Sequence, residues 1–167
     1  APRGAGFIGK PHRDCVKASR GWWFGCGREI GRGGDVYVLD WDDADSCGKD
    51  VLQKDTGRIF RLSPKESLAK DWGDRYADVA KLNDDKLVEY QTRASAWHAR
   101  RARVVLQGRA IKGKLAKDTH RALEKMFLKN KNADHRLRAL WSLHVTGGLS
   151  ESELLKHLDD KDAHIRA

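Results

Sequence analysis

Residues 95–111 have the sequence SAWHARRARVVLQGRAI, and this stretch decides the fold class of the larger part of the chain. Its small and aliphatic side chains recur at the spacing of one helix face, at Ala99, Ala102, Val105, Leu106 and Ala110. Arginines occupy much of the remaining surface. The pattern therefore predicts an amphipathic helix that packs one face into a core.

The same helical period continues to the C-terminus. It predicts further helices at residues 84–91, 115–129, 134–146 and 150–159, and the first turn of another near residue 163. Ser150 and Glu153 have the spacing of a capping box. On the helix at 134–146, we expect Trp141 and His144 to share the core face with Leu137 and Leu140, and Trp141 to fill the space between neighbouring helices.

A short motif repeats along these helices. An aliphatic residue precedes arginine at Ala99-Arg100, Leu137-Arg138 and Ile165-Arg166, and the arginines are 38 and 28 residues apart. Helical pairs of the HEAT type recur at roughly 40 residues. We therefore expect stacked α-hairpins that form an α-solenoid.

The first 62 residues follow a different pattern, because they contain 11 of the 16 glycines. Residues 35–40 and 57–62 alternate as β-strands do, residues 21–25 suggest a third strand, and Phe7-Ile8 suggests a fourth. The fold class predicted is α+β, with an antiparallel β segment at residues 1–63 followed by HEAT-like helices at residues 64–167.

Length and charge exclude several classes of protein. The chain has 167 residues, 33 of them basic and 24 acidic, for a net charge of +9. No apolar run approaches the ~20 residues of a membrane span, and the first residues have no apolar core of a signal peptide. No C-x-x-C-H haem motif is present. Because neither end has the features of a terminus, we expect a piece of a longer protein.

Six stretches, taken in order, resemble one known family. They are GFIGKPHRD at 6–14, DVYVLDWDDAD at 35–45, TGRIFRL at 56–62, WHAR at 97–100, RLRALW at 136–141 and AHIR at 163–166. As an ordered set they resemble a family of bacterial membrane-bound dehydrogenases. Members of that family have a β-propeller similar to that of soluble quinoprotein sugar dehydrogenases, followed by HEAT-like repeats and often by a C-terminal c-type haem domain.

The resemblance implies a place for each part of the chain. Residues 1–63 would be the last strands of the propeller, and the helices would be the first repeats. The parent protein would lie in the periplasm or outside the cytoplasm, associated with the membrane, and would oxidise a sugar or polyol. Calcium, a cofactor similar to pyrroloquinoline quinone, and c-type haem would belong to that parent. The partners implied are the rest of the propeller and a cytochrome-type domain or protein.

An acidic loop follows the strand at 35–40. Its carboxylates, at Asp40, Asp42, Asp43 and Asp45, are of the kind that binds calcium. The loop lacks the EF-hand pattern. A solvated acidic loop is therefore the alternative to a metal site.

Two further groups of residues have a chemical and a structural interpretation. His12 and Arg13 could accept a proton and bind an anion at a propeller mouth, or Arg13 could form a structural ion pair between blades. Cys26 and Cys47 could form a disulfide in an exported protein, or both could be free. The glycines between Gly25 and Gly31 lack the dinucleotide-binding spacing, so we interpret them as turn residues.

Positive charge is concentrated in the helical part. A basic strip is expected at Arg93, Arg100, Arg101, Arg103 and Arg109, followed by Lys112, Lys114 and Lys117. Such a strip can bind phosphate backbones, dock on an acidic domain, or simply be solvated. Aromatic residues for base stacking are few, which makes nucleic acid the less favoured partner.

Two hypotheses for function follow. In the first, the chain is part of an exported dehydrogenase, where it closes the propeller and forms a helical scaffold. In the second, it is a basic HEAT-like module that binds nucleic acid or an acidic protein. No nucleophile and base occur together in a pattern that would make a complete active site within the chain.

Overall fold

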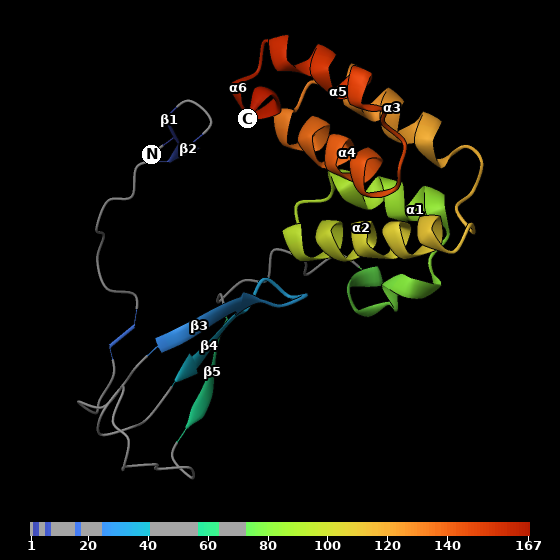
Figure 1. Ribbon diagram of the computed structural model, residues 1–167. Coiled ribbons are helices and arrows are strands. Elements are labelled where there is room, and N and C mark those ends of the chain that lie inside the picture. The colour runs from blue at the N-terminus through green and yellow to red at the C-terminus, as the bar shows by residue number, and fades with distance from the viewer. Residues whose placement is uncertain (1, 4–5, 8–15, 18–24, 41–56, 64–72) are drawn as a thin grey trace, which may run out of the picture. The chain divides into compact units, whose positions relative to one another are not determined.

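The computed structural model describes residues 2–3, 6–7, 16–17, 25–40, 57–63 and 73–167 (Figure 1). Contacts divide the chain into two compact units, one formed by Ala1–Lys10 with Ala77–Ala167 and the other by Pro11–Tyr76. The second unit contains an antiparallel sheet and the first contains α-helices, which confirms the predicted α+β class. The predicted boundary at residues 63–64 adjoins a stretch outside the described residues and stays a prediction.

The sheet has three described strands in sequential order, β3 (Gly25–Ile30), β4 (Val36–Asp40) and β5 (Arg58–Leu62). The central strand, β4, pairs with both neighbours, so that Val38 lies opposite Arg28 on one side and Phe60 on the other. Val38 and Asp40 are buried, whereas Leu39 between them is exposed. This alternation confirms the strands predicted at 35–40 and 57–62.

Of the glycines interpreted as turn residues, Gly25 and Gly27 lie in β3, whereas Gly31 begins the turn that follows the strand. Gly25 and Gly27 pair with Asp40 and Leu39 of β4, and a bulge between the two glycines accommodates the irregular spacing. The turn instead lies just after this strand, where Gly34 has a φ of 81° that favours glycine. Residues 21–24 of the strand predicted at 21–25 lie outside the described residues.

The strand predicted at Phe7-Ile8 is not part of this sheet. Gly6–Phe7 forms β2, which among the described strands pairs with β1 (Pro2–Arg3) in a separate two-stranded ladder. Ile8 lies outside the described residues.

The helices begin where the sequence places polar caps. Their bounds are α1 (Asp84–Glu89), α2 (Ala96–Ile111), α3 (Thr119–Lys129), α4 (Ala133–Val145), α5 (Glu151–Lys156) and α6 (Ala163–Arg166). Short 3-10 turns occur at η1 (Gly73–Tyr76), η2 (Val79–Lys81), η3 (Tyr90–Thr92) and η4 (His157–Asp159). The predicted capping box is confirmed, because Ser150 and Glu153 bond each other's backbone N–H.

Two predicted helices are shorter than expected. The helix predicted at 115–129 starts only at Thr119, and the one predicted at 150–159 changes to a 3-10 turn after Lys156. The backbone of Gly113 has a φ of 63°, and the N–H of Lys114 returns to the carbonyl of Arg109, so that α2 ends in a turn and the next helix starts later.

Helices packed in pairs form the core of the helical unit. Helix α3 packs against α4, α2 packs against α1 and α4, and α4 also contacts α6. Figure 1 shows α2 and α4 lying side by side. The largest side chains that are fully buried come from several of these elements and include Tyr90, Leu106, Leu123, Phe127 and Leu143.

The face of α4 that enters the core differs from the predicted one. Ala139, Leu140 and Leu143 are buried, whereas His144 is exposed and Trp141 keeps 45% of its surface exposed. The buried residues Ala139, Ser142 and Leu143 follow the three- and four-residue spacing of one helix face, and Trp141 lies on the opposite face. The expectation that Trp141 fills a core is therefore wrong.

A buried carboxylate joins the first three helices. Asp84, the first residue of α1, is bound by the guanidinium of Arg109 in α2. It also accepts hydrogen bonds from the backbone N–H of Ala116, at 2.6 Å, and from the hydroxyl of Thr119, at 3.1 Å. Arg109 continues the network, because it also donates to the carbonyl of Leu82 at 2.6 Å.

These bonds set the protonation behaviour of Asp84. Burial by itself raises the pKa of the carboxyl, but the hydrogen bonds from Ala116, Arg109 and Thr119 together outweigh it and lower the pKa below its usual value. The network therefore stabilises the fold above the unfolded-state pKa, and that contribution is lost as pH falls through the folded-state pKa.

We expect Asp84→Asn to destabilise the protein by about 3 kcal/mol, because it leaves the partly buried guanidinium of Arg109 without its counter-charge. The matched control is Asp118→Asn, whose ion pair with Arg121 is exposed at both side chains and which should change stability by less than about 0.5 kcal/mol. Urea unfolding followed by circular dichroism measures both. A smaller loss of stability on acidification below about pH 4 should accompany Asp84→Asn, and equal destabilisation by both variants would contradict the structural role.

Candidate anion-binding cleft

A cleft of about 530 Å³ lies between α2 and α4. One wall comes from α2 and the other from α4. The lining residues are Ala96, Ala99, Arg100, Arg103, Asp134, Leu137, Arg138 and Trp141. The cleft thus brings together three arginines, one carboxylate and one large aromatic side chain.

The repeated sequence motif explains why the arginines meet. Ala99-Arg100 on α2 and Leu137-Arg138 on α4 are corresponding pairs of the repeat, and they occupy opposite walls. Positions three or four residues apart lie on one side of a helix, so Arg103 and Trp141 extend the two walls by about one turn. The repeat was visible in the sequence, but it did not indicate that its members face each other.

Arg103 contacts the aromatic side chain of the cleft. Its guanidinium lies over the indole of Trp141, 4.9 Å from the ring centroid, at a distance typical of a cation–π contact. The Nη1 atom of Arg103 is buried and has no hydrogen-bond partner among the described residues. A buried donor without a partner costs free energy, so this atom favours a ligand that can accept from it.

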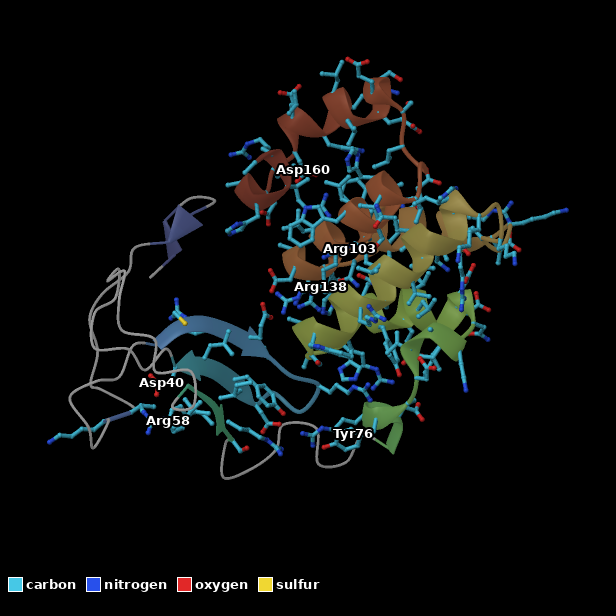
Figure 2. All side chains as sticks on the ribbon, turned by 60° about the horizontal axis from the view of Figure 1, so that its bottom comes forward. Asp40, Arg58, Tyr76, Arg103, Arg138 and Asp160 are labelled. Atoms are coloured by element: carbon cyan, nitrogen blue, oxygen red, sulfur yellow. The ribbon has the colours of Figure 1, made fainter. Side chains whose placement is uncertain are left out.

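The electrostatic environment of Arg103 also favours an anionic ligand. Burial is the main cause of the lowered pKa of its guanidinium, and the positive charges of Arg138 and then Arg100 lower that pKa further. Figure 2 labels Arg103 and Arg138 on the two neighbouring helices. The cleft therefore concentrates like charges, whose mutual repulsion an anion would relieve.

Arg138 is held in place by backbone carbonyls. Its Nη1 donates to the carbonyl of Gln91 at 3.2 Å and to that of Arg93 at 2.8 Å. These bonds tie α4 to the turn before α2 but do not neutralise the charge. Within the part of the chain that the structure describes, no ion pair involves Arg100, Arg103 or Arg138. Asp134 is the one acidic residue that lines this cleft.

The basic strip predicted from the sequence separates into residues with different roles. Arg93 pairs with Glu89 at 2.5 Å, and Arg109 belongs to the buried network around Asp84. Arg100 and Arg103 line the cleft, whereas the exposed Arg101 does not. Sequence reasoning missed Arg138 and Trp141 as members of the site, although both lie in or beside the second copy of the repeat.

The other predicted sites fall largely outside the described residues. These residues are His12, Arg13, Asp42, Asp43, Asp45 and Cys47. Asp40 is described, and its carboxylate accepts from Arg58 across β4 and β5 at 2.6 and 3.0 Å (Figure 2). The exposed Cys26 has its Sγ 3.6 Å from the carbonyl of Leu39. The calcium site, the His12–Arg13 site and the disulfide therefore stay predictions.

The described residues also bear on metal binding and on membrane insertion. They contain no cluster of three or more His, Cys, Asp or Glu side chains that could hold a metal ion. In the same residues, no helix is both long and apolar enough to cross a membrane. His98 is fully buried, and its Nδ1 lies 2.8 Å from the hydroxyl of Ser95.

We expect Trp141→Ala to destabilise the protein less than Leu143→Ala, because Trp141 forms a wall of the cleft while Leu143 is 1% exposed. Leu143→Ala should cost about 3 kcal/mol, the usual range for a buried leucine. Urea unfolding followed by circular dichroism measures both variants. If Trp141→Ala costs as much as Leu143→Ala, Trp141 is a core residue and not part of a binding surface.

When the chain is compared with known protein families, with curated proteins and with solved structures, none of them matches it. The resemblance to membrane-bound dehydrogenases therefore stays a prediction. The inference of function rests on the chemistry of the cleft between α2 and α4.

Proposed function

We propose that the helical unit is an interaction module that binds an acidic segment of a partner protein in the cleft between α2 and α4. The observation that carries this proposal is the buried Nη1 of Arg103, which has no partner among the described residues and is surrounded by the charges of Arg100 and Arg138. Anionic oxygens are the acceptors that such a set of donors binds most strongly.

A protein partner is favoured over nucleic acid by how the arginines are distributed. A phosphate backbone presents charge along its length, so affinity for it comes from many cations spread over a surface. Here Arg93 and Arg109 are neutralised by Glu89 and Asp84, whereas three arginines without an ion pair among the described residues, Arg100, Arg103 and Arg138, line one cleft. A compact site of this kind suits one or two acidic groups on a folded or extended segment.

The scaffold role in an exported dehydrogenase is a compatible second proposal. The packing that supports it is the succession of α2, α4 and α6, which carry the three copies of the repeated motif and contact one another in turn. Such an arrangement is typical of HEAT-like repeats. In that setting the acidic segment would belong to a neighbouring domain or to an electron-accepting partner.

We expect a fluorescently labelled octaglutamate peptide to bind the protein at 150 mM salt, and Arg100→Glu to weaken that binding by at least tenfold. Arg101→Glu is the matched control, because it makes the same charge reversal at the adjacent exposed position outside the cleft. It should change the affinity by less than about threefold, since Arg101 does not line the cleft and its charge is screened by solvent at this ionic strength. Fluorescence anisotropy gives both affinities.

Two results would contradict this proposal. If both reversals weaken octaglutamate equally, binding comes from the diffuse positive charge and not from the cleft. If a 20-nucleotide single-stranded DNA binds more tightly than octaglutamate and loses affinity steeply with salt, the partner is nucleic acid.

A further inference from the structure

We infer that the acidic group recognised by the cleft is a phosphate monoester dianion, carried by a phosphorylated serine or threonine of the partner segment. This inference rests on the proposed function and specifies the ligand of the same site. It follows from the charge of the cleft, from the arrangement of its donors on two walls, and from the mixture of polar and apolar residues around them.

The charge of the cleft matches a dianion better than a monoanion. Three guanidinium groups and one carboxylate line it, which leaves an excess of two positive charges. A carboxylate would neutralise one of these, whereas a phosphate monoester carries about −1.5 to −2 at pH 7. Because Arg103 is partly buried and repelled by Arg138 and Arg100, the second negative charge brings a further gain in this site.

The donors also suit a tetrahedral group. Arg100 and Arg103 come from α2, and Arg138 comes from α4, so the positive groups approach the cleft from opposite sides. The two oxygens of a carboxylate lie in one plane and are best met by one guanidinium fork. The three terminal oxygens of a phosphate monoester point in different directions and can accept from both walls at once.

The apolar residues of the cleft favour a peptide-borne phosphate over the free ion. Ala96, Ala99 and Leu137 line the same cleft, and Trp141 exposes part of its indole there. These side chains offer contact area to the residues that flank a phosphorylated side chain, whereas inorganic phosphate has nothing to place against them.

Displacement of labelled octaglutamate by three unlabelled peptides tests the inference. The peptides share the sequence Gly-Ser-X-Ser-Gly, with phosphoserine, glutamate or serine at X. At pH 7.4 we expect the phosphoserine peptide to compete at least tenfold more strongly than the glutamate peptide, and the serine peptide not to compete. Arg100→Glu should reduce competition by the phosphoserine peptide by at least tenfold, and Arg101→Glu by less than about threefold.

A pH series tests whether the cleft recognises the second negative charge of the phosphate. The second pKa of a phosphate monoester is near 6, so the phosphoserine peptide should lose up to about tenfold in affinity between pH 7.4 and pH 5.0. The charged groups that line the cleft are the guanidinium groups of Arg100, Arg103 and Arg138 and the carboxylate of Asp134, and no histidine is among its lining residues. The glutamate peptide should therefore change little over the same interval.

Asp134→Asn gives a second, independent variant. It removes the one carboxylate that lines the cleft and should raise the affinity for the phosphoserine peptide by a few fold. Its side chain is exposed, so folding should be retained. Unchanged or weaker binding would contradict the placement of the phosphate in this cleft.

The outcomes separate this inference from the proposed function. If glutamate competes as well as phosphoserine, the phosphate assignment is overturned while the acidic-partner proposal stands. If octaglutamate binds the protein but inorganic phosphate displaces it as well as the phosphoserine peptide does, the ligand is the free anion. If octaglutamate itself does not bind and the phosphoserine peptide produces no signal in calorimetry, both proposals fail.

Discussion

The helical unit depends on the carboxylate of Asp84, which receives donors from α2, from the loop before α3 and from α3 itself. A carboxylate that is buried to this degree must have its charge compensated, and three donors together do so. Because Arg109 also bonds carbonyls in the stretch before α1, the direction of α2 is tied to the preceding chain at its C-terminal end. Near the other end of α2, the backbone carbonyls of Gln91 and Arg93 bond Arg138 of α4. The bonds from Arg138 therefore tie α4 to the turn before α2, whereas the network around Asp84 ties α2 to α1 and α3.

Arginine has two roles in this unit, and the difference lies in its partners. Arg109 and Arg136 are structural: Arg136 pairs with Asp160 at 2.5 Å, donates to the carbonyl of Phe127 at 2.9 Å and lies over the Phe127 ring. In both cases the guanidinium bridges two elements, and a carboxylate neutralises its charge. Arg103, in contrast, has an aromatic ring and two like charges as neighbours. The contrast between compensated and uncompensated guanidinium groups is what distinguishes a structural contact from a binding surface here.

Much of the architecture could be predicted from local sequence patterns. The helix at α2 follows from the spacing of its alanines and leucine, the strands β4 and β5 follow from alternation, and the cap at Ser150 follows from the glutamate three residues later. Each of these patterns depends only on residues within one element, so it can be recognised in the sequence without knowing which elements pack against it. The strand β3 was the exception, because glycine has a low strand propensity and only pairing with β4 makes an extended conformation favourable for these residues.

The cleft could be predicted only in part, and the reason is physical. Sequence shows that Arg93, Arg100, Arg103 and Arg109 lie within a short stretch, and it shows that a motif containing Arg100 recurs at Arg138. Charge neutralisation, however, depends on partners that are distant along the chain, as Asp84 is 25 residues from Arg109. Arg103 instead contacts the indole of Trp141, which comes from another helix. Periodicity also placed Trp141 in the core, but the face of α4 that is buried carries Ala139 and Leu143 and lies opposite Trp141. Local composition and period thus specify which segments are helices and which residues are basic. Only the packing of α2 against α4 specifies which guanidinium groups remain without a counter-charge, because that depends on which distant carboxylates come within reach.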